Sequence, residues 1–156
     1  MPQTPTFLVI NGPNLNRLGR RDPALYGSTT LADVEKALTR RAGELGAAVA
    51  FFQSNHEGAI VDFIQEKAGS AAGAIINAGA LTQVGYSILD ALLDSGLPVV
   101  EVHISNIHAR EEFRRHSVIA PFAKGQIVGL GWRGYIYALE YLVAEAGAGR
   151  AGKGAI

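Results

Sequence analysis

Polar and titratable side chains stand where four apolar stretches of the sequence end. The stretches are Phe7–Ile10, Ala47–Gln53, Ala74–Ile76 and Val99–Ile104, and the polar residues at their ends are Asn11, Asn14, Ser54, Asn55, His56, Asn77, Glu101, His103, Ser105 and Asn106. A histidine inside an apolar stretch needs a hydrogen-bonding partner or a chemical task. A lone buried histidine is more often structural than catalytic, but His103 stands beside Ser105 and Asn106 and is therefore a candidate for a functional site. Ser54 and Asn55 are explained at least as well as helix caps.

Arginine dominates the cationic residues. Four of the fourteen are lysine, so ten are arginine, and six of these form two clusters: Arg17, Arg20, Arg21 and Arg110, Arg114, Arg115. A guanidinium group makes planar, bidentate contacts with oxyanions that lysine cannot make. The clusters predict a small anionic ligand. For any single arginine, a solvated, salt-bridged surface position is the commoner explanation.

The apolar stretches alternate with helical patterns. Helices are expected from Thr30, as N-cap, to Leu45, from Glu57, over Thr82–Asp94, briefly near Arg110–Arg114 and over Trp132–Ala146, and a fifth strand is expected over Gln126–Val128. Five such units predict a three-layer α/β domain with a parallel sheet covered on both faces. We expect the flavodoxin-like strand order 2-1-3-4-5, with ligands at the carboxyl ends of the strands.

Length and composition limit the number of domains, the kinds of partner and the cellular location that we expect. The chain has 156 residues, 48% of them hydrophobic, and a mean hydropathy of +0.15, which indicates a single globular domain over residues 1–146. Residues 147–156 are mostly Gly and Ala and are expected to form a flexible tail. A formal net charge of zero argues against a nucleic-acid partner. No stretch has membrane-spanning length and none resembles a signal peptide, so a cytoplasmic location is expected.

Several kinds of site are disfavoured. The absence of cysteine excludes disulfides, thiol catalysis and cysteine-ligated metals, and four scattered histidines do not suggest a metal site. The segment Gly129–Gly134 matches G-x-G-x-x-G, but it follows the last strand, and no acidic residue stands about twenty positions later to bind a ribose. We interpret it as a tight turn between strand and helix. A receiver domain would need an aspartate where this chain has Asn77.

Four blocks of the sequence together resemble type II 3-dehydroquinate dehydratases. They occur in order within residues 6–146, and they are Asn11–Asn16 with Gly19–Pro23 and Tyr26-Gly27, Gln53–Gly58, Ile76–Ala80, and Glu101–Arg114. The resemblance implies a flavodoxin-like lyase without metal or cofactor that removes water from the small molecule 3-dehydroquinate. It also implies a homododecamer arranged as a tetramer of trimers.

The same resemblance implies a role for individual residues in the elimination. Tyr26 would take a proton from C2 of the substrate, and Arg21 would hold Tyr26 in its reactive state. His103 would protonate the departing C1 hydroxyl, and Glu101 would orient His103. Asn14 would orient a water molecule that stabilises the enolate formed between these two proton transfers.

The remaining implied residues would bind the substrate. Asn77 and the backbone amides of Ile104 and Ser105 would bind its carboxylate. Arg114 would bind a ring hydroxyl, and Asp90 would reach the site of a neighbouring subunit.

A tyrosine that acts as a base needs a nearby cation to stabilise its anion, and Arg21 could supply it. A free tyrosine loses its proton only near pH ~10. A cation ~4 Å away, at an effective dielectric constant of ~20, supplies roughly the 4 kcal/mol needed to bring this near neutrality. Arg21 lies five residues from Tyr26 in a segment rich in Gly and Pro, which suits a lid that excludes water. The alternative is that Tyr26 only anchors this loop.

The third block departs from the family pattern. Thr82-Gln83-Val84-Gly85 stands where Thr-His-Thr-Ser is usual, and Asp22 stands where Glu is common. Gln83 can still donate and accept hydrogen bonds but cannot become cationic, so we expect activity with weaker substrate affinity. Two alternatives stay open: a dehydratase of a related cyclic hydroxy acid, and a non-catalytic module that binds a small carboxylate. No lysine lies in an expected strand, which disfavours Schiff-base chemistry.

Overall fold

Five parallel strands form a single sheet in the computed structural model, which describes residues 3–151. The strands are β1 (Thr6–Asn11), β2 (Ala48–Gln53), β3 (Gly73–Asn77), β4 (Val99–His103) and β5 (Gly125–Val128). Their order is β2-β1-β3-β4-β5, as the sequence predicts. The strand bounds differ from the expected ones by no more than one residue. Strands β1, β3 and β5 extend slightly beyond the apolar runs, whereas β2 begins one residue later and β4 ends one residue earlier.

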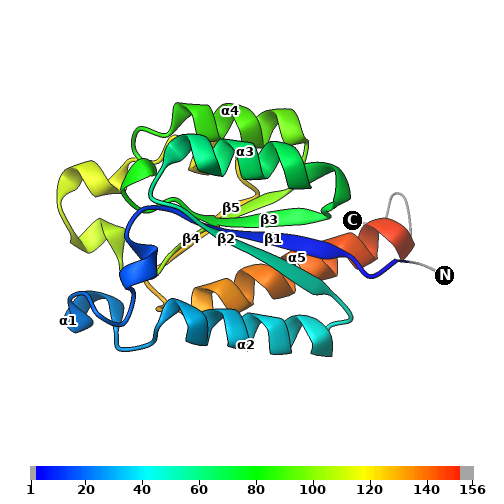
Figure 1. The fold of residues 1–156 in the computed structure, drawn as a ribbon, viewed down its shortest axis with the longest axis horizontal. Coiled ribbons are helices and arrows are strands. Elements are labelled where there is room, and N and C mark those ends of the chain that lie inside the picture. The colour runs from blue at the N-terminus through cyan, green and yellow to red at the C-terminus, as the bar shows by residue number, and fades with distance from the viewer. Residues whose placement is uncertain (1–2, 152–156) are drawn as a thin grey trace.

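Two helices cover each face of the sheet (Figure 1). Helices α2 (Leu31–Glu44) and α5 (Arg133–Ala151) lie on one face, and α3 (Glu57–Lys67) and α4 (Tyr86–Ser95) lie on the other. Successive side chains of a strand point to opposite faces, so Phe7 and Val9 join the α2–α5 core while Leu8 and Ile10 join the α3–α4 core. Both cores are apolar, which explains why the central strands are continuously hydrophobic.

Local capping fixes where α2 begins. The Thr30 hydroxyl accepts a hydrogen bond from the backbone amide of Asp33 at 3.1 Å, and the Asp33 carboxylate accepts one from the amide of Thr30 at 3.0 Å. This reciprocal pair satisfies two backbone donors that a helix start otherwise leaves unpaired. The prediction of Thr30 as N-cap is confirmed. The hydrogen bond from the Thr30 amide lowers the pKa of the Asp33 carboxyl.

Helix α4 begins later than expected. The sequence pattern predicts a helix from Thr82, but Gly79–Leu81 forms a 3₁₀ turn and the regular helix starts at Tyr86. The amide of Gly85 donates to the carbonyl of Leu81 at 2.7 Å, and a Cβ atom at Gly85 would lie 2.7 Å from that oxygen. Glycine therefore permits a tight approach that delays the helix, and this delay determines where Gln83 lies.

The last helix is longer than expected, and the region near Arg110 is less regular. Helix α5 continues to Ala151, five residues beyond the expected end at Ala146, and residues 152–156 lie outside the described residues. The flexibility of the tail stays a prediction. Extending an existing helix costs less than starting one, which offsets the poor propensity of Gly147 and Gly149. The expected helical piece near Arg110–Arg114 is two 3₁₀ turns, Ile107–Ala109 and Glu112–Arg115.

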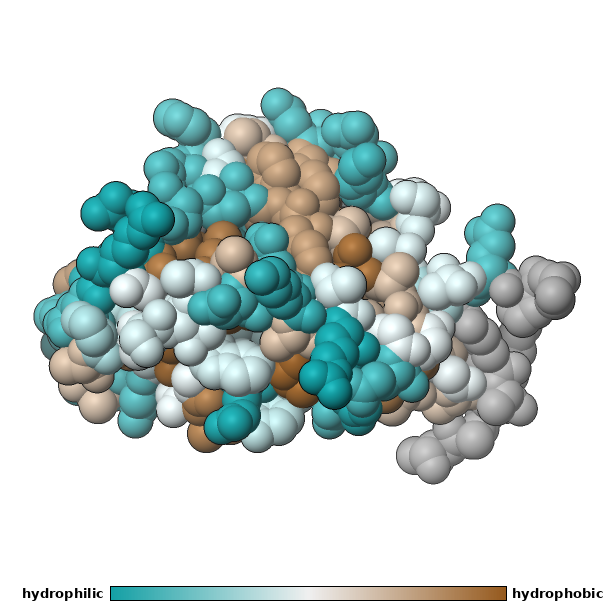
Figure 2. Space-filling view, turned by 60° about the horizontal axis from the view of Figure 1, so that its bottom comes forward, coloured by the Kyte–Doolittle hydropathy of each residue, from teal (hydrophilic) through white to brown (hydrophobic). Residues whose placement is uncertain are grey.

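The surface on the α2 and α5 side mixes hydrophilic and apolar side chains (Figure 2). Between α2 and the edge strand β2, half-buried Phe51 lies in a shallow groove bordered by Glu35, Lys36 and Arg40. None of these four residues lines the pocket described below. In residues 3–151, no helix is both long and apolar enough to span a membrane.

Candidate active site

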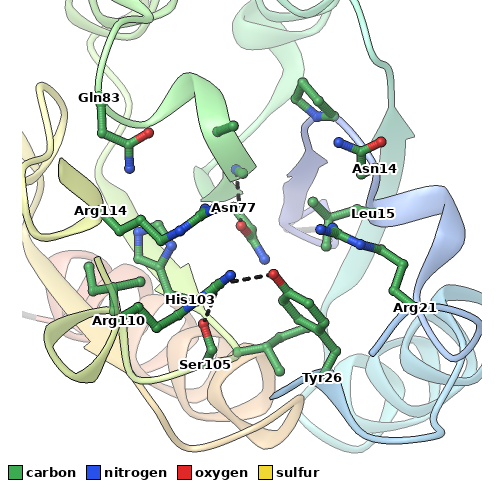
Figure 3. A pocket seen from close by; sticks show the side chains of 15 residues that line it. Asn14, Leu15, Arg21, Tyr26, Asn77, Gln83, His103, Ser105, Arg110 and Arg114 are labelled. Carbon is green, nitrogen blue, oxygen red and sulfur yellow. Dashed lines mark hydrogen bonds between the residues drawn. The ribbon is translucent and has the colours of Figure 1, made fainter. Parts of the chain in front are cut away.

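A pocket opens where the carboxyl ends of β1, β3 and β4 meet (Figure 3). Nine of the residues predicted to form a site line it: Asn14, Arg21, Tyr26, Asn77, Gln83, His103, Ile104, Ser105 and Arg114. They come from segments up to a hundred residues apart in the sequence. Glu101 is fully buried behind His103, and Asp90 is exposed on α4 outside the pocket.

A close approach of two loops shapes the side of the pocket that carries Asn14. The amide of Gly12 donates to the carbonyl of Asn77 at 2.8 Å, and a Cβ atom at Gly12 would lie 2.4 Å from the carbonyl oxygen of Ala78. Only glycine fits there. The chain then turns through Asn14, which has a φ of 69° in the left-handed region.

The second sequence block supports this turn. The Asn55 side-chain oxygen accepts hydrogen bonds from the amide of Asn14 at 3.0 Å and from the Gln53 side chain at 3.2 Å. Gln53 also donates to the carbonyl of Gly12 at 3.1 Å. Asn55 therefore holds the backbone at Asn14 rather than capping α3, whereas Ser54 accepts a hydrogen bond from the amide of His56 at the helix start.

Two guanidinium groups surround Tyr26, which ends the short helix α1 (Pro23–Tyr26). The Arg21 Cζ atom lies 4.6 Å from the centre of the Tyr26 ring, and Arg110 Cζ lies 5.4 Å from it. Arg110 Nη1 donates to the Tyr26 hydroxyl at 2.9 Å and to the Ser105 hydroxyl at 3.2 Å. Arg21 thus lies against the ring, and Arg110 is the cation that contacts the hydroxyl oxygen.

Arg110 is the site residue that the sequence reasoning did not assign. Its side chain lines the pocket beside Tyr26 and Ser105 (Figure 3). The only available signal was its membership of the second arginine cluster, seven residues after His103. Nothing in the spacing distinguishes it from Arg115, which does not line the pocket, because the irregular turns after β4 decide which arginine points inward.

A buried carboxylate supports His103. The His103 Nε2 atom lies 2.7 Å from Oε2 of Glu101, and the side chains are 7% and 0% exposed. Ser117 and Gln126 also donate to the Glu101 carboxylate. Burial alone raises the pKa of Glu101, but these hydrogen bonds and the charge of His103 outweigh it and hold the pKa below its usual value. Glu101 is therefore a carboxylate near neutral pH.

Asn77 is held by a buried polar pair on the α5 side. Its side-chain nitrogen donates to the Tyr135 hydroxyl at 2.9 Å, and that hydroxyl donates to Asn11 at 2.6 Å. The amide of Gly79 donates to the Asn77 oxygen at 3.2 Å. Burial raises the pKa of Tyr135, so it stays a neutral hydroxyl that both donates and accepts. These contacts fix the orientation of the Asn77 amide beneath the pocket.

Gln83 and Arg114 lie on the opposite side of the pocket from Asn14 and Arg21 (Figure 3). The Arg114 guanidinium forms an ion pair with Glu111 and lies 4.8 Å from the centre of the Phe113 ring. The hydrogen bond from Arg114 lowers the pKa of Glu111. Together with Arg21 and Arg110, this residue gives the pocket three guanidinium groups, which suits an anionic ligand.

The glycine-rich segment after β5 is a turn, as interpreted from the sequence. The amide of Gly129 donates to the carbonyl of His103, and the amide of Gly131 to that of Ile104, both at 3.1 Å. Both glycines have positive φ, 84° and 65°, which non-glycine residues rarely adopt. The segment therefore anchors the end of β4 and so helps to position His103.

Comparison with known proteins identifies the family. Residues 5–143 match the family model described as dehydroquinase class II. A Bacillus pumilus protein named 3-dehydroquinate dehydratase is 55% identical over 144 residues, covering 92% of this chain and 98% of the relative. A Neosartorya fischeri protein named catabolic 3-dehydroquinase 1 is 55% identical over 137 residues, covering 88% and 91%.

A solved structure is similar over the same region. The crystal structure of type II dehydroquinase from Propionibacterium acnes has a TM-score of 0.87 and 42% sequence identity, and the match covers 92% of this chain and 99% of that one. The family match spans all four sequence blocks and the whole sheet. The chain belongs to the class II dehydroquinase family.

Proposed function

We propose that this protein is a 3-dehydroquinate dehydratase that removes water from 3-dehydroquinate to give 3-dehydroshikimate through an enolate. The observation that carries the proposal is one pocket lined by Tyr26 with two guanidinium groups and by His103 with a buried carboxylate. Loss of water requires a base on one carbon and an acid at the leaving hydroxyl. The family membership supports the same reaction.

Tyr26 is the base that removes the proton from C2. The hydrogen bond from Arg110 and the nearby charge of Arg21 stabilise a phenolate more than a phenol, because both are cations beside the ring oxygen or the ring face. The electron pair left at C2 moves into the adjacent carbonyl and forms the enolate. A water molecule held by Asn14 hydrogen-bonds to the enolate oxygen.

His103 is the acid that completes the elimination. As the enolate collapses, the C1–oxygen bond breaks, and the hydroxyl takes a proton from His103 and leaves as water. Because Glu101 occupies Nε2, Nδ1 is the ring nitrogen that can face the substrate. Both residues return to their starting protonation states when the proton on Tyr26 passes to solvent or to His103.

The substrate carboxylate binds beside Asn77. The proposed donors are the Asn77 amide and the backbone amides of Ile104 and Ser105, which line the pocket. Arg114 binds a ring hydroxyl, and Gln83 binds another at the position where the family commonly has histidine. Gln83 cannot be cationic, so affinity for the substrate is weaker than a histidine would provide.

Twelve subunits, arranged as a tetramer of trimers, would complete the site. Asp90 is exposed on α4 and lies outside the pocket of its own chain, which fits a residue that acts on a neighbouring subunit. Sedimentation of a monomer alone would refute this assembly. The cytoplasmic location predicted above stays a prediction.

The decisive test is an absorbance assay with EDTA-treated protein. Conversion of 3-dehydroquinate gives a conjugated enone, so a rise in ultraviolet absorbance is expected without added cofactor. A dehydratase for a related cyclic hydroxy acid would instead turn over another ring acid in a substrate panel. Binding of 3-dehydroquinate without any product would favour a carboxylate-binding module and contradict the proposal.

A further inference from the structure

The Glu101 carboxylate accepts hydrogen bonds from three side chains, and only one of them is the proposed acid. His103 Nε2 lies 2.7 Å from Oε2, and Ser117 Oγ lies 2.6 Å from Oε1. The side-chain amide of Gln126 donates to Oε2 as well. Since Glu101 is 0% exposed, these donors replace the water that the carboxylate loses on folding.

Strand pairing places Gln126 beside Glu101. The two residues are direct partners in the register of β4 and β5, so their side chains point to the same face of the sheet. On the other neighbouring strand, β3, the partner of Glu101 is the buried apolar Ile76. The carboxylate is therefore flanked by a hydrocarbon side chain on one strand and by an amide donor on the other.

Ser117 is a fixed donor from the segment that follows the second 3₁₀ turn. Its hydroxyl oxygen accepts hydrogen bonds from the amides of Ile119 at 3.1 Å and Ala120 at 2.9 Å. With its oxygen engaged, the hydroxyl hydrogen is directed to Glu101 Oε1. The adjacent His116 is exposed. The titratable group in contact with Glu101 is thus His103 on β4, and Arg114 lines the same pocket as His103.

We propose that Gln126 is a positioning residue that keeps Glu101 ionised and aligned with Nε2 of His103. This inference rests on the proposed role of His103 as the acid. Gln126 and His103 share one carboxylate oxygen, whereas Ser117 holds the other, so the carboxylate has no free rotation. Loss of the Gln126 donor leaves a buried anion with one hydrogen bond fewer, and such an anion takes up a proton more readily.

A change from Gln126 to Met tests this directly, because Met has similar length but no N–H donor. Carboxyl carbons labelled with ¹³C in glutamate report the ionisation of Glu101 by NMR, with Glu101→Gln identifying its signal. The midpoint of the Glu101 titration is expected to rise by about one pH unit in Gln126→Met. Gln65→Met, the same change at an exposed position on α3, should leave it unchanged.

Two further variants distinguish loss of a hydrogen-bond donor from a local folding defect in Gln126→Met. Ser117→Ala removes the donor to the other oxygen and should move the midpoint in the same direction. Gln126→Lys keeps an N–H donor and adds a positive charge, so its midpoint should lie at or below that of the parent. An unchanged midpoint in both Gln126→Met and Ser117→Ala overturns the inference.

Turnover then separates a positioning role from a merely structural one. The acid limb of the kcat profile should move to higher pH in Gln126→Met by the same amount as the NMR midpoint, while KM changes little. A loss of kcat that is equal at every pH overturns the positioning role. An inactive parent protein would contradict the proposed function instead, and the NMR titration would still decide the role of Gln126.

Discussion

The pocket has an acid side, which carries the proposed acid His103, and a base side, which carries the proposed base Tyr26. The two sides are built in different ways. His103 lies on a central strand, is nearly buried, and contacts a carboxylate that has two further donors. Tyr26 ends a four-residue helix in a segment that is mostly exposed, and its hydroxyl is held by Arg110 from another loop. The proposed acid is thus part of the folded core, whereas the proposed base is carried by a surface segment.

Because of this difference, changes on the two sides of the pocket should affect stability and turnover to different degrees. A strand side chain with a buried ionic partner cannot move without disturbing the core, so its geometry is set once by folding. Movement of a short surface helix would let substrate enter before the proposed base reaches C2. Changes on the acid side should therefore alter both stability and pH dependence, and changes on the base side should alter turnover with little effect on stability.

The largest effect is expected when either proton-transfer group is removed. Tyr26→Phe and His103→Ala should each lower kcat roughly 10²–10⁴-fold while keeping the far-ultraviolet circular dichroism of the parent. Tyr141→Phe and His56→Ala change the same residue types at exposed positions and serve as controls. A Tyr26→Phe enzyme with near-parental turnover would remove Tyr26 from its role.

Urea unfolding of the same two variants sharpens the comparison. His103→Ala removes a contacting partner from the buried Glu101 carboxylate, so the free energy of unfolding should fall by about 3–5 kcal/mol. Tyr26→Phe removes one half-buried hydroxyl and should change it by less than about 1 kcal/mol. Equal losses in both variants would mean that the two sides are not built differently.

The next largest effect on turnover is expected from Arg110. Arg110→Met removes the donor to the Tyr26 hydroxyl and should lower kcat by roughly 10–100-fold, from a charged hydrogen bond worth ~1.5–3 kcal/mol. The control is Arg115→Met, in the same cluster but outside the pocket. Parental kcat in Arg110→Met would show that Arg21 alone activates Tyr26.

Low pH should reduce the contribution of Glu101, behind the proposed acid His103, to the free energy of unfolding. The pKa of Glu101 is lowered in the folded protein, so its contribution to stability is present above its ordinary value of 4.5 and is lost as pH falls through the folded value. The difference in unfolding free energy between the parent and Glu101→Gln should be about 1–3 kcal/mol near pH 7 and should shrink below about pH 4.5. A difference independent of pH between 7 and 3 would contradict this assignment.

The smallest effect is expected at Gln83, which belongs to neither side. Gln83→His restores the residue common in the family and should lower KM for 3-dehydroquinate a few-fold, about 1 kcal/mol, with kcat nearly unchanged. Gln65→His, on an exposed helix face, should leave KM as in the parent. Unchanged KM in Gln83→His would mean that glutamine already makes the full interaction.

The strand order and the edge where the site lies could be predicted from the sequence. Continuous apolar runs such as Phe7–Ile10 can be buried only in a sheet covered on both faces, and parallel strands bring their carboxyl ends to one edge. The start of α2 was equally predictable, because capping by Thr30 depends on residues three positions apart. In each case the cause is local in the chain or repeats along it.

Contacts between distant segments required the tertiary structure. The choice of Arg110 over Arg115 and the donors Ser117 and Gln126 on Glu101 depend on how loops and neighbouring strands pack together. Hydrogen bonds such as these join residues sixteen to eighty-four positions apart, and no periodicity in the sequence encodes such a pairing. The sequence alone determined the scaffold and most of the residue types in the pocket, whereas side-chain packing decided which groups act together.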